Sequence, residues 1–200
     1  MAAVSERDRI IDCAVELAEQ SSWEAVRLHE VAARLNISLD DIRAHFREKE
    51  EIADAFFDRA DEAMLAAAHA PGFGTLTTRE KLERLILAWL DALAPHKRAA
   101  RGMILSKLEP GHLHVLFPAI LRTSRTVQWM REAAGRHQTC ICRAAEETAT
   151  TGIFLATLGC WLFDDTPERR RTRALLDWKL RAAERFARLW TPSPTPSPAR

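Results

Sequence analysis

The spacing of apolar residues is the feature that most constrains how this chain can fold. Through almost its whole length they recur at steps of three and four, which gathers them on one side of a helix. The clearest case is a segment whose apolar residues take positions i, i+3, i+4 and i+7, namely Leu28, Val31, Ala32 and Leu35. No alternating strand pattern and no tandem repeat occurs in the sequence. We therefore expect an all-α fold of about nine helices.

Turn-forming residues near the N-terminus divide this pattern. Asn36-Ile37-Ser38 separates two short helices, because Asn tolerates the left-handed conformation and Ser can cap the helix that follows, with Asp41 at the capping-box position. That helix is expected to bury Leu39, Ile42 and Phe46. The sequence therefore predicts a helix-turn-helix unit within the first 50 residues.

Pro, Gly and capping residues bound the remaining helices. A fourth helix is expected over about 49–68, and the segment 71–77 (PGFGTLT) is expected to join the N-terminal module to a larger body. Thr77 and Glu80 form a second capping box before a helix that Pro95 closes. Further helices are expected over 97–108, 112–135 with a kink or break at Pro118, 137–163, and from Pro167 to about Trp190. The final TPSPTPSPAR is expected to be disordered.

The composition is that of an ordinary globular chain. Its 200 residues include 47% hydrophobic and 28% charged side chains, enough for a small module and one sizeable core. Four cysteines follow no disulfide spacing, and MAAVSERDRI lacks the apolar run of a secretory signal. The longest apolar stretch, 152–163, is shorter than the roughly 20 residues that span a bilayer. A cytoplasmic protein without membrane insertion is expected.

The charge distribution does not by itself favour nucleic-acid binding. The formal net charge is +1, and residues 1–50 hold seven Lys or Arg against eleven Asp or Glu. The end of the chain that carries the helix-turn-helix is therefore acidic by count, so this count supplies no general attraction to phosphates.

Two stretches together resemble a known family. They are R-x-x-I-I-x-x-A-x-x-L in residues 7–17 and VRLHEVAARLNISLDDIRAHFREKEEI in residues 26–52. The pattern resembles the TetR family of one-component bacterial regulators over about the first 60 residues. The resemblance implies that Arg27 opens a supporting helix, that residues 38–45 form a recognition helix, and that Lys49 meets a phosphate. The DNA-binding residues that it implies are Arg27, Ser38, Leu39, Asp40, Asp41, Arg43, Ala44, His45 and Lys49.

Three positions depart from that family's usual pattern. Asn36 stands where Gly is usual and also accepts the left-handed turn. Arg43 stands where Tyr is usual, and Arg can contact a phosphate or a guanine edge. Asp40 and Asp41 stand where small or basic residues are usual. Carboxylates there favour the helix N-terminus and repel phosphates, although Asp can also accept a hydrogen bond from cytosine N4.

The C-terminal part resembles a second family more weakly. Residues 151–186 hold W-L-x-D-D-T-P followed by T-x-x-L-L-D, which is similar to ubiquinone-biosynthesis lipid-binding proteins of TetR-like fold. In that family a further amphipathic helix engages membrane. Here the chain passes from Trp190 directly into TPSPTPSPAR, so the sequence offers no such helix.

Both resemblances imply an apolar cavity in the body and a paired assembly. The helices expected to enclose the cavity supply the candidate ligand-binding residues Trp89, Phe117, Trp129, Phe154 and Trp161. The last two helices of such bodies commonly pair with their copies in a dimer. The residues expected in that four-helix interface are Leu158, Leu162, Leu176, Leu180 and Phe186.

The sequence does not favour catalysis or metal binding. Cys140 and Cys142, like His112 and His114, are two residues apart and would lie on opposite faces of a helix. No zinc-binding, phosphate-loop or nucleophile-elbow motif occurs. Arg169, Arg170, Arg171 and Arg173 alternate with acidic residues and are read as a solvated helix face. Neither an enzyme nor a metal or cofactor site is expected.

The leading hypothesis is therefore a homodimeric TetR-like regulator that binds operator DNA and is released by a small apolar effector. The expected division is a DNA-binding domain over 1–50, a ligand-binding and dimerisation domain over 51–190, and the tail 191–200. The alternative is a lipid- or isoprenoid-binding accessory protein of the same fold with a vestigial helix-turn-helix.

Overall fold

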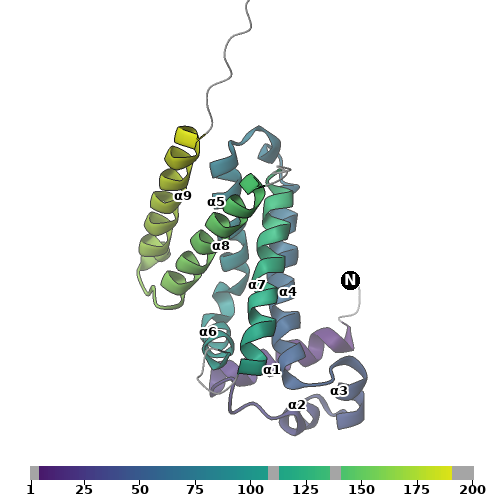
Figure 1. The fold of residues 1–200 in the computed structure, drawn as a ribbon. Coiled ribbons are helices and arrows are strands. Elements are labelled where there is room, and N and C mark those ends of the chain that lie inside the picture. The colour runs from purple at the N-terminus through teal and green to yellow at the C-terminus, as the bar shows by residue number, and fades with distance from the viewer. Residues whose placement is uncertain (1–4, 108–112, 136–140, 191–200) are drawn as a thin grey trace, which may run out of the picture.

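Every regular element of the described chain is helical. The computed structural model describes residues 5–107, 113–135 and 141–190, and their side chains except those of residues 113–121, 141–145 and 188–190. No strand occurs among these residues, so the all-α prediction is confirmed (Figure 1). The predicted tail 191–200 lies outside the described residues, as do His112 and Cys140.

The helices follow the order that the apolar pattern predicts. They are α1 (Glu6–Gln20), α2 (Leu28–Leu35), α3 (Leu39–His45), α4 (Lys49–Ala68), α5 (Thr78–Leu93), α6 (Lys97–Ser106), α7 (Leu113–Ala133), α8 (Ile141–Leu162) and α9 (Arg170–Trp190). Three short 3₁₀ turns precede later helices, at Phe73–Thr75, Ala94–His96 and Pro167–Arg169. Both predicted capping boxes are present, at Ser38 with Asp41 and at Thr77 with Glu80.

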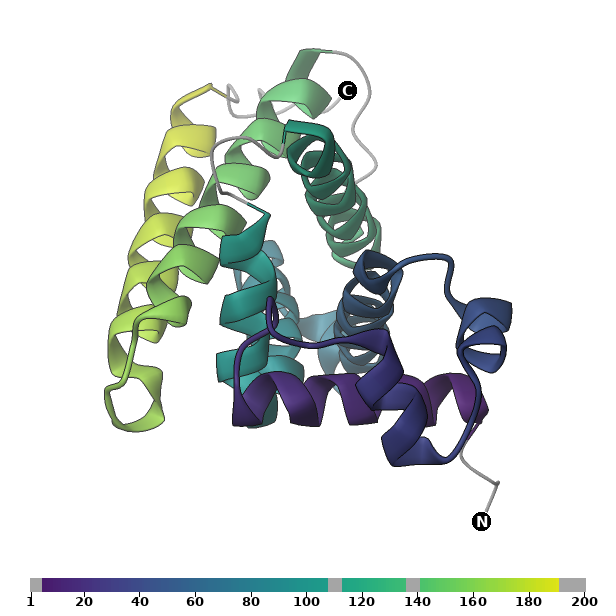
Figure 2. The same ribbon diagram turned by 90° about the horizontal axis from the view of Figure 1, so that it is seen from below.

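The helices form a small unit at one end of a longer bundle. In Figure 1, α1, α2 and α3 lie together at the bottom, while α4 and α7 rise side by side above them. The pair α8 and α9 lies along the other side of the bundle, against α5 and α7. Viewed from below, α1 crosses beneath the bundle close to α6 (Figure 2). The helix-turn-helix therefore stands at a free end of the molecule.

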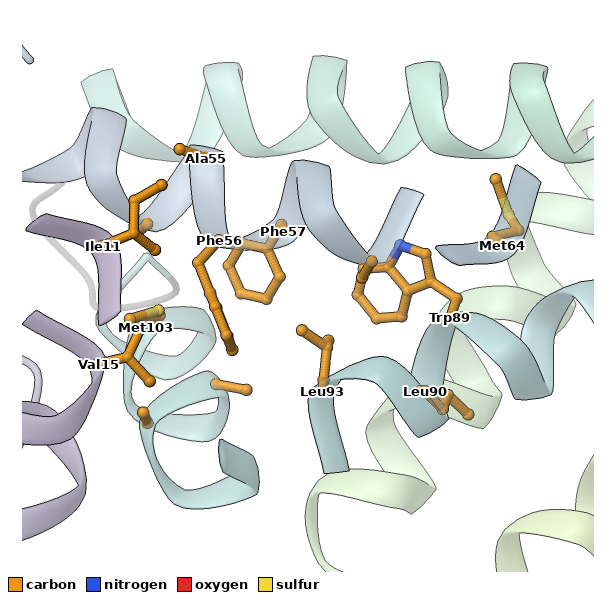
Figure 3. Close-up of a cluster of buried hydrophobic side chains, with 14 of the residues drawn as sticks. Ile11, Val15, Ala55, Phe56, Phe57, Met64, Trp89, Leu90, Leu93 and Met103 are labelled. Carbon is orange, nitrogen blue, oxygen red and sulfur yellow. The ribbon is translucent and has the colours of Figure 1, made fainter. Parts of the chain in front are cut away.

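One hydrophobic core runs from the N-terminal unit into the bundle. Figure 3 shows Ile11 and Val15 of α1 in the same cluster as Phe56 of α4, Leu93 of α5 and Met103 of α6. Burial of such a continuous apolar surface is the main favourable term in folding. The N-terminal unit is thus packed onto the bundle.

The segment 71–77 is not the joint that the sequence suggested. It connects α4 to α5, which pack along each other inside the bundle, and Phe73 within it is buried. Gly72 has a positive φ of 81°, which glycine adopts without steric cost, so the segment is a tight helix-to-helix connection. Since α4 begins at Lys49, the predicted domain boundary at residue 50 falls at the start of this helix and stays a prediction.

Two proline predictions are also corrected. The helix α7 continues through Pro118, so the predicted break is wrong, whereas the alternative of a kink stays a prediction. The missing N–H of this proline removes only the hydrogen bond to residue 114, near the start of the helix. Pro167 opens a 3₁₀ turn rather than the last helix, because Glu168 and Arg169 take positive φ angles of 54° and 56°. The helix α9 starts after them.

The predicted dimer residues divide between the core and the surface. Leu162, Leu176 and Leu180 are buried inside the protomer, and Leu158 packs against the same core. Only Phe186, at 63% exposure, faces outward among the five. Both α8 and α9 carry apolar residues on two sides, and periodicity alone does not tell which side meets the bundle.

Candidate nucleic-acid interface

The turn between α2 and α3 has the conformation that its sequence predicts. Asn36 has φ 55° and ψ 46°, in the left-handed region. Its N–H donates to the carbonyl of Ala33 at 3.3 Å, and the N–H of Ile37 donates to the carbonyl of Ala32 at 3.0 Å. This pair of bonds satisfies the last carbonyls of α2 in the arrangement known as the Schellman motif. It fixes the angle at which α3 leaves α2.

The first turn of α3 is held by a reciprocal cap. The backbone N–H of Asp41 donates to Ser38 Oγ at 3.1 Å, and the backbone N–H of Ser38 donates to Asp41 Oδ2 at 2.8 Å. Hydrogen bonds from the Ser38 backbone and hydroxyl lower the pKa of Asp41. The carboxylate of Asp41 is therefore engaged within its own helix, as the capping interpretation predicts.

The packing of α3 corrects one expected core residue. Ile42 and Phe46 are buried as predicted, whereas Leu39 is 53% exposed. The buried pair anchors α3 against α1 and α2, and Arg7 lies 5.2 Å above the ring of Phe46. Leu39 lies on the outer side of α3, where a residue that contacts DNA would lie.

Arg27 and Lys49 are directed toward the protein backbone in this structure. The guanidinium of Arg27 donates to the carbonyls of Glu24 and Val26. Lys49 Nζ donates to the carbonyl of Trp23 at 3.0 Å and lies 5.0 Å from the centre of its ring, and burial lowers the pKa of Lys49. Both cations thus stabilise the loop between α1 and α2. Their contacts with DNA phosphates stay predictions.

The negative charge counted in the first 50 residues is largely engaged within the protein. Asp8 Oδ1 pairs with Arg59 of α4 at 2.8 Å, and Arg59 also pairs with Asp12. Glu6 lies 3.3 Å from His45 Nε2 at the end of α3. Glu16 pairs with Arg34, and Glu19 accepts a hydrogen bond from the backbone N–H of Ala99. Glu50 accepts one from the indole N–H of Trp23. The net count for residues 1–50 therefore omits one cation, Arg59, which pairs with two of these carboxylates.

Polar contacts also bind the N-terminal unit to α6. Glu19 Oε1 accepts a 2.8 Å hydrogen bond from the Ala99 N–H in the first turn of α6, and Arg98 donates to the carbonyl of Ser21 at 2.8 Å. Trp23 is 1% exposed, and a Cβ placed on Gly102 would lie 3.4 Å from its Cβ. Sequence reasoning missed Trp23, although a single large apolar residue in the polar loop SSWEA was a signal for it.

Two of the predicted ligand-binding residues meet in the body. The Trp89 ring stacks on Phe57 at a centroid distance of 6.0 Å and meets the edge of Phe154 at 5.1 Å. Trp161 is fully buried about two turns farther along α8, against Lys97. Trp129 is 50% exposed and does not join this group. The side chain of Phe117 lies outside the described residues.

A partly buried polar cluster that the sequence did not reveal adjoins this aromatic group. Asp61 Oδ1 accepts hydrogen bonds from Trp89 Nε1 at 2.8 Å and from the Thr126 hydroxyl at 2.9 Å. Arg122 of α7 lies 3.4 Å from Asp61 Oδ2 and 2.8 Å from Asp58 Oδ1. Burial raises the pKa of Asp61 although Trp89 and Arg122 act to lower it. The cluster joins residues of α4, α5 and α7, so the sequence does not show that they meet.

The W-L-x-D-D-T-P motif has a structural role in the turn between α8 and α9. The buried Asp164 carboxylate accepts four hydrogen bonds, from the N–H and the hydroxyl of Thr166 and of Thr172. Burial acts to raise the pKa of Asp164, but these hydrogen bonds together hold it well below its ordinary value. Thr172 lies in the first turn of α9, so Asp164 caps this helix.

Other features favour neither a metal site nor a membrane segment. Within the described residues, no group of three or more His, Cys, Asp or Glu side chains is placed to hold a metal ion. No helix in the described part of the chain has the length and apolar character to cross a membrane. In the basic run at the start of α9, Arg170, Arg171 and Arg173 are exposed as predicted, whereas Arg169 pairs with Asp91 of α5.

Solved structures share this architecture over nearly their full lengths. The TetR transcriptional regulator from Nitrosomonas europaea is similar at 50% sequence identity over 89% of this chain and 97% of that chain, with a TM-score of 0.79. A TetR regulator from Rhodococcus has 19% identity over 86% of this chain and 93% of that chain, with a TM-score of 0.64. No protein-family model and no curated protein matches the chain.

The first of these similarities is decisive because half of the aligned residues are identical across almost the whole of both chains. It agrees with the N-terminal motif, the left-handed Asn36 and the capped α3. The chain therefore belongs to the TetR family of transcriptional regulators.

Proposed function

We propose that this protein is a one-component regulator that binds operator DNA as a homodimer and is released by a small apolar effector. The observation that carries the proposal is the position of α3. This helix stands at the free end of the molecule, with Ile42 buried behind it and Leu39 exposed on its outer side. A helix that is anchored on one side and free on the other suits insertion into a major groove.

DNA binding is tested by gel shift with duplexes selected from a random library, over a range of salt concentrations. Ala44→Glu adds a charge on the exposed side of α3 and should weaken binding at least tenfold. Ala66→Glu adds the same charge on the exposed side of α4, away from α3, and should leave binding unchanged. Absence of sequence-dependent binding by the wild type even at low salt contradicts the proposal.

Exposed glycine and apolar residues on α8 and α9 support a homodimer. On α8, Gly152, Leu155 and Gly159 recur at steps of three and four on the exposed or half-exposed side, and Leu155 is 47% exposed. On the neighbouring α9, Trp178 is 62% exposed. A Cβ placed on either glycine would meet nothing within 4 Å. A second copy could therefore approach α8 closely and cover Trp178, as a twofold interface requires.

Sedimentation velocity tests the dimer. Trp178→Glu places a charge on the exposed side of α9 and should shift the protein to monomers, with weaker operator binding because only one half-site is then held. Arg125→Glu changes an exposed residue of α7 and should leave the dimer intact. A wild type that sediments as a monomer at micromolar concentration contradicts this part of the proposal.

The aromatic and polar cluster in the body supports an effector site there. Ligand sites are mostly apolar with a few polar groups that fix orientation. Trp89 and Phe154 supply the apolar surface, and Asp61 with Arg122 supplies the polar groups. An effector that separates these two rings would move the helices that carry them. Through α6 and Trp23 it would also move the N-terminal unit.

A panel of small apolar compounds tests the effector site. An effector should raise the melting temperature of the wild type and release its DNA. Phe154→Ala should abolish both responses, whereas Trp129→Ala on the exposed side of α7 should keep them. A compound that releases DNA equally from both variants acts elsewhere. The solved structures described above are regulators, and no observation on this chain supports the lipid-binding alternative better than the regulator.

A further inference from the structure

The side chains of α3 divide into an anchored and a free set. The cap holds Ser38 and Asp41 together, Ile42 is buried, and His45 lies beside Glu6. Successive residues turn by about 100° on a helix, so the remaining residues share the opposite side. These are Leu39, Asp40, Arg43 and Ala44, and all four are exposed.

Two charged residues on this free side, Asp40 and Arg43, contribute to the proposal that follows. Over the residues that the structure describes, neither Asp40 nor Arg43 takes part in a side-chain hydrogen bond or ion pair. An unpaired carboxylate on a surface that meets DNA is repelled by phosphates and lowers affinity for every sequence. It favours binding only where it meets a hydrogen-bond donor.

The major groove offers such donors on only some bases. Cytosine presents its N4 amino group, whereas guanine and thymine present acceptors toward the same edge. Adenine presents its N6 amino group beside the acceptor N7, which repels a carboxylate. The guanidinium of Arg43 has the opposite preference, because its fork of donors fits O6 and N7 of guanine.

We propose that Asp40 and Arg43 determine operator specificity, Asp40 by selecting a cytosine and Arg43 by selecting a guanine. The two residues are three apart on one side of α3, a rise of about 4.5 Å, so the bases lie within one or two base pairs of each other. Leu39 and Ala44 flank them and suit a thymine methyl group. This inference rests on the proposed function, since it concerns how the same helix reads DNA.

Selection from a random duplex library tests the inference with matched variants. Asp40→Asn keeps the shape of the side chain but pairs with adenine through N6 and N7, so one position in each half-site should switch from cytosine to adenine. The wild type should lose roughly 5- to 150-fold in affinity when this cytosine is replaced. Glu30→Gln removes an equal charge from the exposed first turn of α2 and should change no base preference. Replacing the selected guanine by 7-deazaguanine removes N7 and should weaken wild-type binding but not that of Arg43→Ala.

The outcomes separate this inference from the proposed function. If Asp40→Asn raises affinity for all sequences as Glu30→Gln does and switches no position, Asp40 serves only the helix terminus and the inference is overturned. Equal sensitivity of the wild type and Arg43→Ala to 7-deazaguanine overturns the role of Arg43. A wild type that enriches no sequence at any salt concentration contradicts the proposed function itself.

Discussion

Replacing Asp164 by Asn should destabilise the protein strongly although the two side chains have nearly the same shape. The carboxylate accepts hydrogen bonds from the backbone N–H groups of Thr166 at 3.0 Å and Thr172 at 2.8 Å, one on each oxygen. An amide has only one oxygen. The hydroxyls can rotate to accept from the new amino group, but one backbone N–H must lose its acceptor.

The size of the effect follows from the lost hydrogen bond and from the backbone N–H that is left without an acceptor. A hydrogen bond to a charged group contributes about 1.5–3 kcal/mol, and a buried donor left without a partner costs about 1–3 kcal/mol. Since the two figures describe overlapping losses, we expect a decrease of about 3 kcal/mol in the free energy of unfolding. For a chain of this length, that decrease lowers the melting temperature by about 6–12 °C.

Urea unfolding at one fixed protomer concentration measures the effect, with Asp165→Ala as the control. Asp165 is the neighbouring carboxylate, and its side chain is 94% exposed in a pair with Lys97. Such a surface pair contributes at most about 1 kcal/mol. A difference below 0.5 kcal/mol (about a twofold change in the unfolding equilibrium) between Asp164→Asn and Asp165→Ala would refute the reasoning.

The pH dependence gives a second check on Asp164. Its pKa in the folded protein lies below the ordinary value of 3.8. The unfolded chain therefore takes up the proton first as the pH falls. The stabilisation is fully present above about pH 5 and is lost as the pH falls toward the folded pKa. The difference in the free energy of unfolding between wild type and Asp164→Asn should accordingly shrink below pH 4. A constant difference from pH 7 to pH 3.5 contradicts this role of Asp164.

Three further substitutions test the turn, the link to α6 and the polar cluster around Asp61, each by urea unfolding. Asn36→Ala should cost about 1 kcal/mol because alanine disfavours a φ of 55°, whereas Asn36→Gly should cost nothing. Gly102→Leu should cost about 1–3 kcal/mol by displacing Trp23, whereas Gly102→Ala fits at the 3.4 Å contact and gains helix propensity. Arg122→Met should cost about 1.5–3 kcal/mol by removing the charged hydrogen-bond partner of Asp61, and adding Asp61→Asn should recover part of that loss.

A result that contradicts one of these three predictions would show which structural interpretation is wrong. Equal stability of the Ala and Gly variants at position 36 would mean that the left-handed turn is not needed. Tolerance of Leu at position 102 would mean that Trp23 is free to move. Additive losses in the double variant would mean that Asp61 and Arg122 do not interact.

Much of the fold could be predicted because it depends on local chemistry. The helix boundaries at Ser38 and Thr77 follow from side chains that bond to backbone groups three residues away. Asn36 ends α2 because few other residues accept its conformation. These interactions join residues close in sequence, so their spacing is visible before the chain is folded.

The wrong assignments of buried and exposed residues arose where a helix has apolar residues on two sides. For α9 the sequence suggested Leu176 and Leu180 as dimer residues, whereas the bundle buries both and leaves Trp178 outside. Period alone fixes which residues share a side, but the neighbouring helix decides which side faces inward. The same reason explains why Leu39 was assigned to the core.

The candidate site also has features that the sequence predicts and features that only the tertiary structure decides. The sequence by itself determined an all-α chain, a capped helix-turn-helix near its N-terminus and a turn at Asn36, because propensities and caps act over a few residues. Only the tertiary structure decided that Arg59 pairs with Asp8 and Asp12 of α1 and that Asp61 meets Arg122. It also decided that, among the described residues, Asp40 and Arg43 form no side-chain hydrogen bond or ion pair. Those pairings depend on which helices pack together, and the distances between side chains on different helices are set only when the whole core closes.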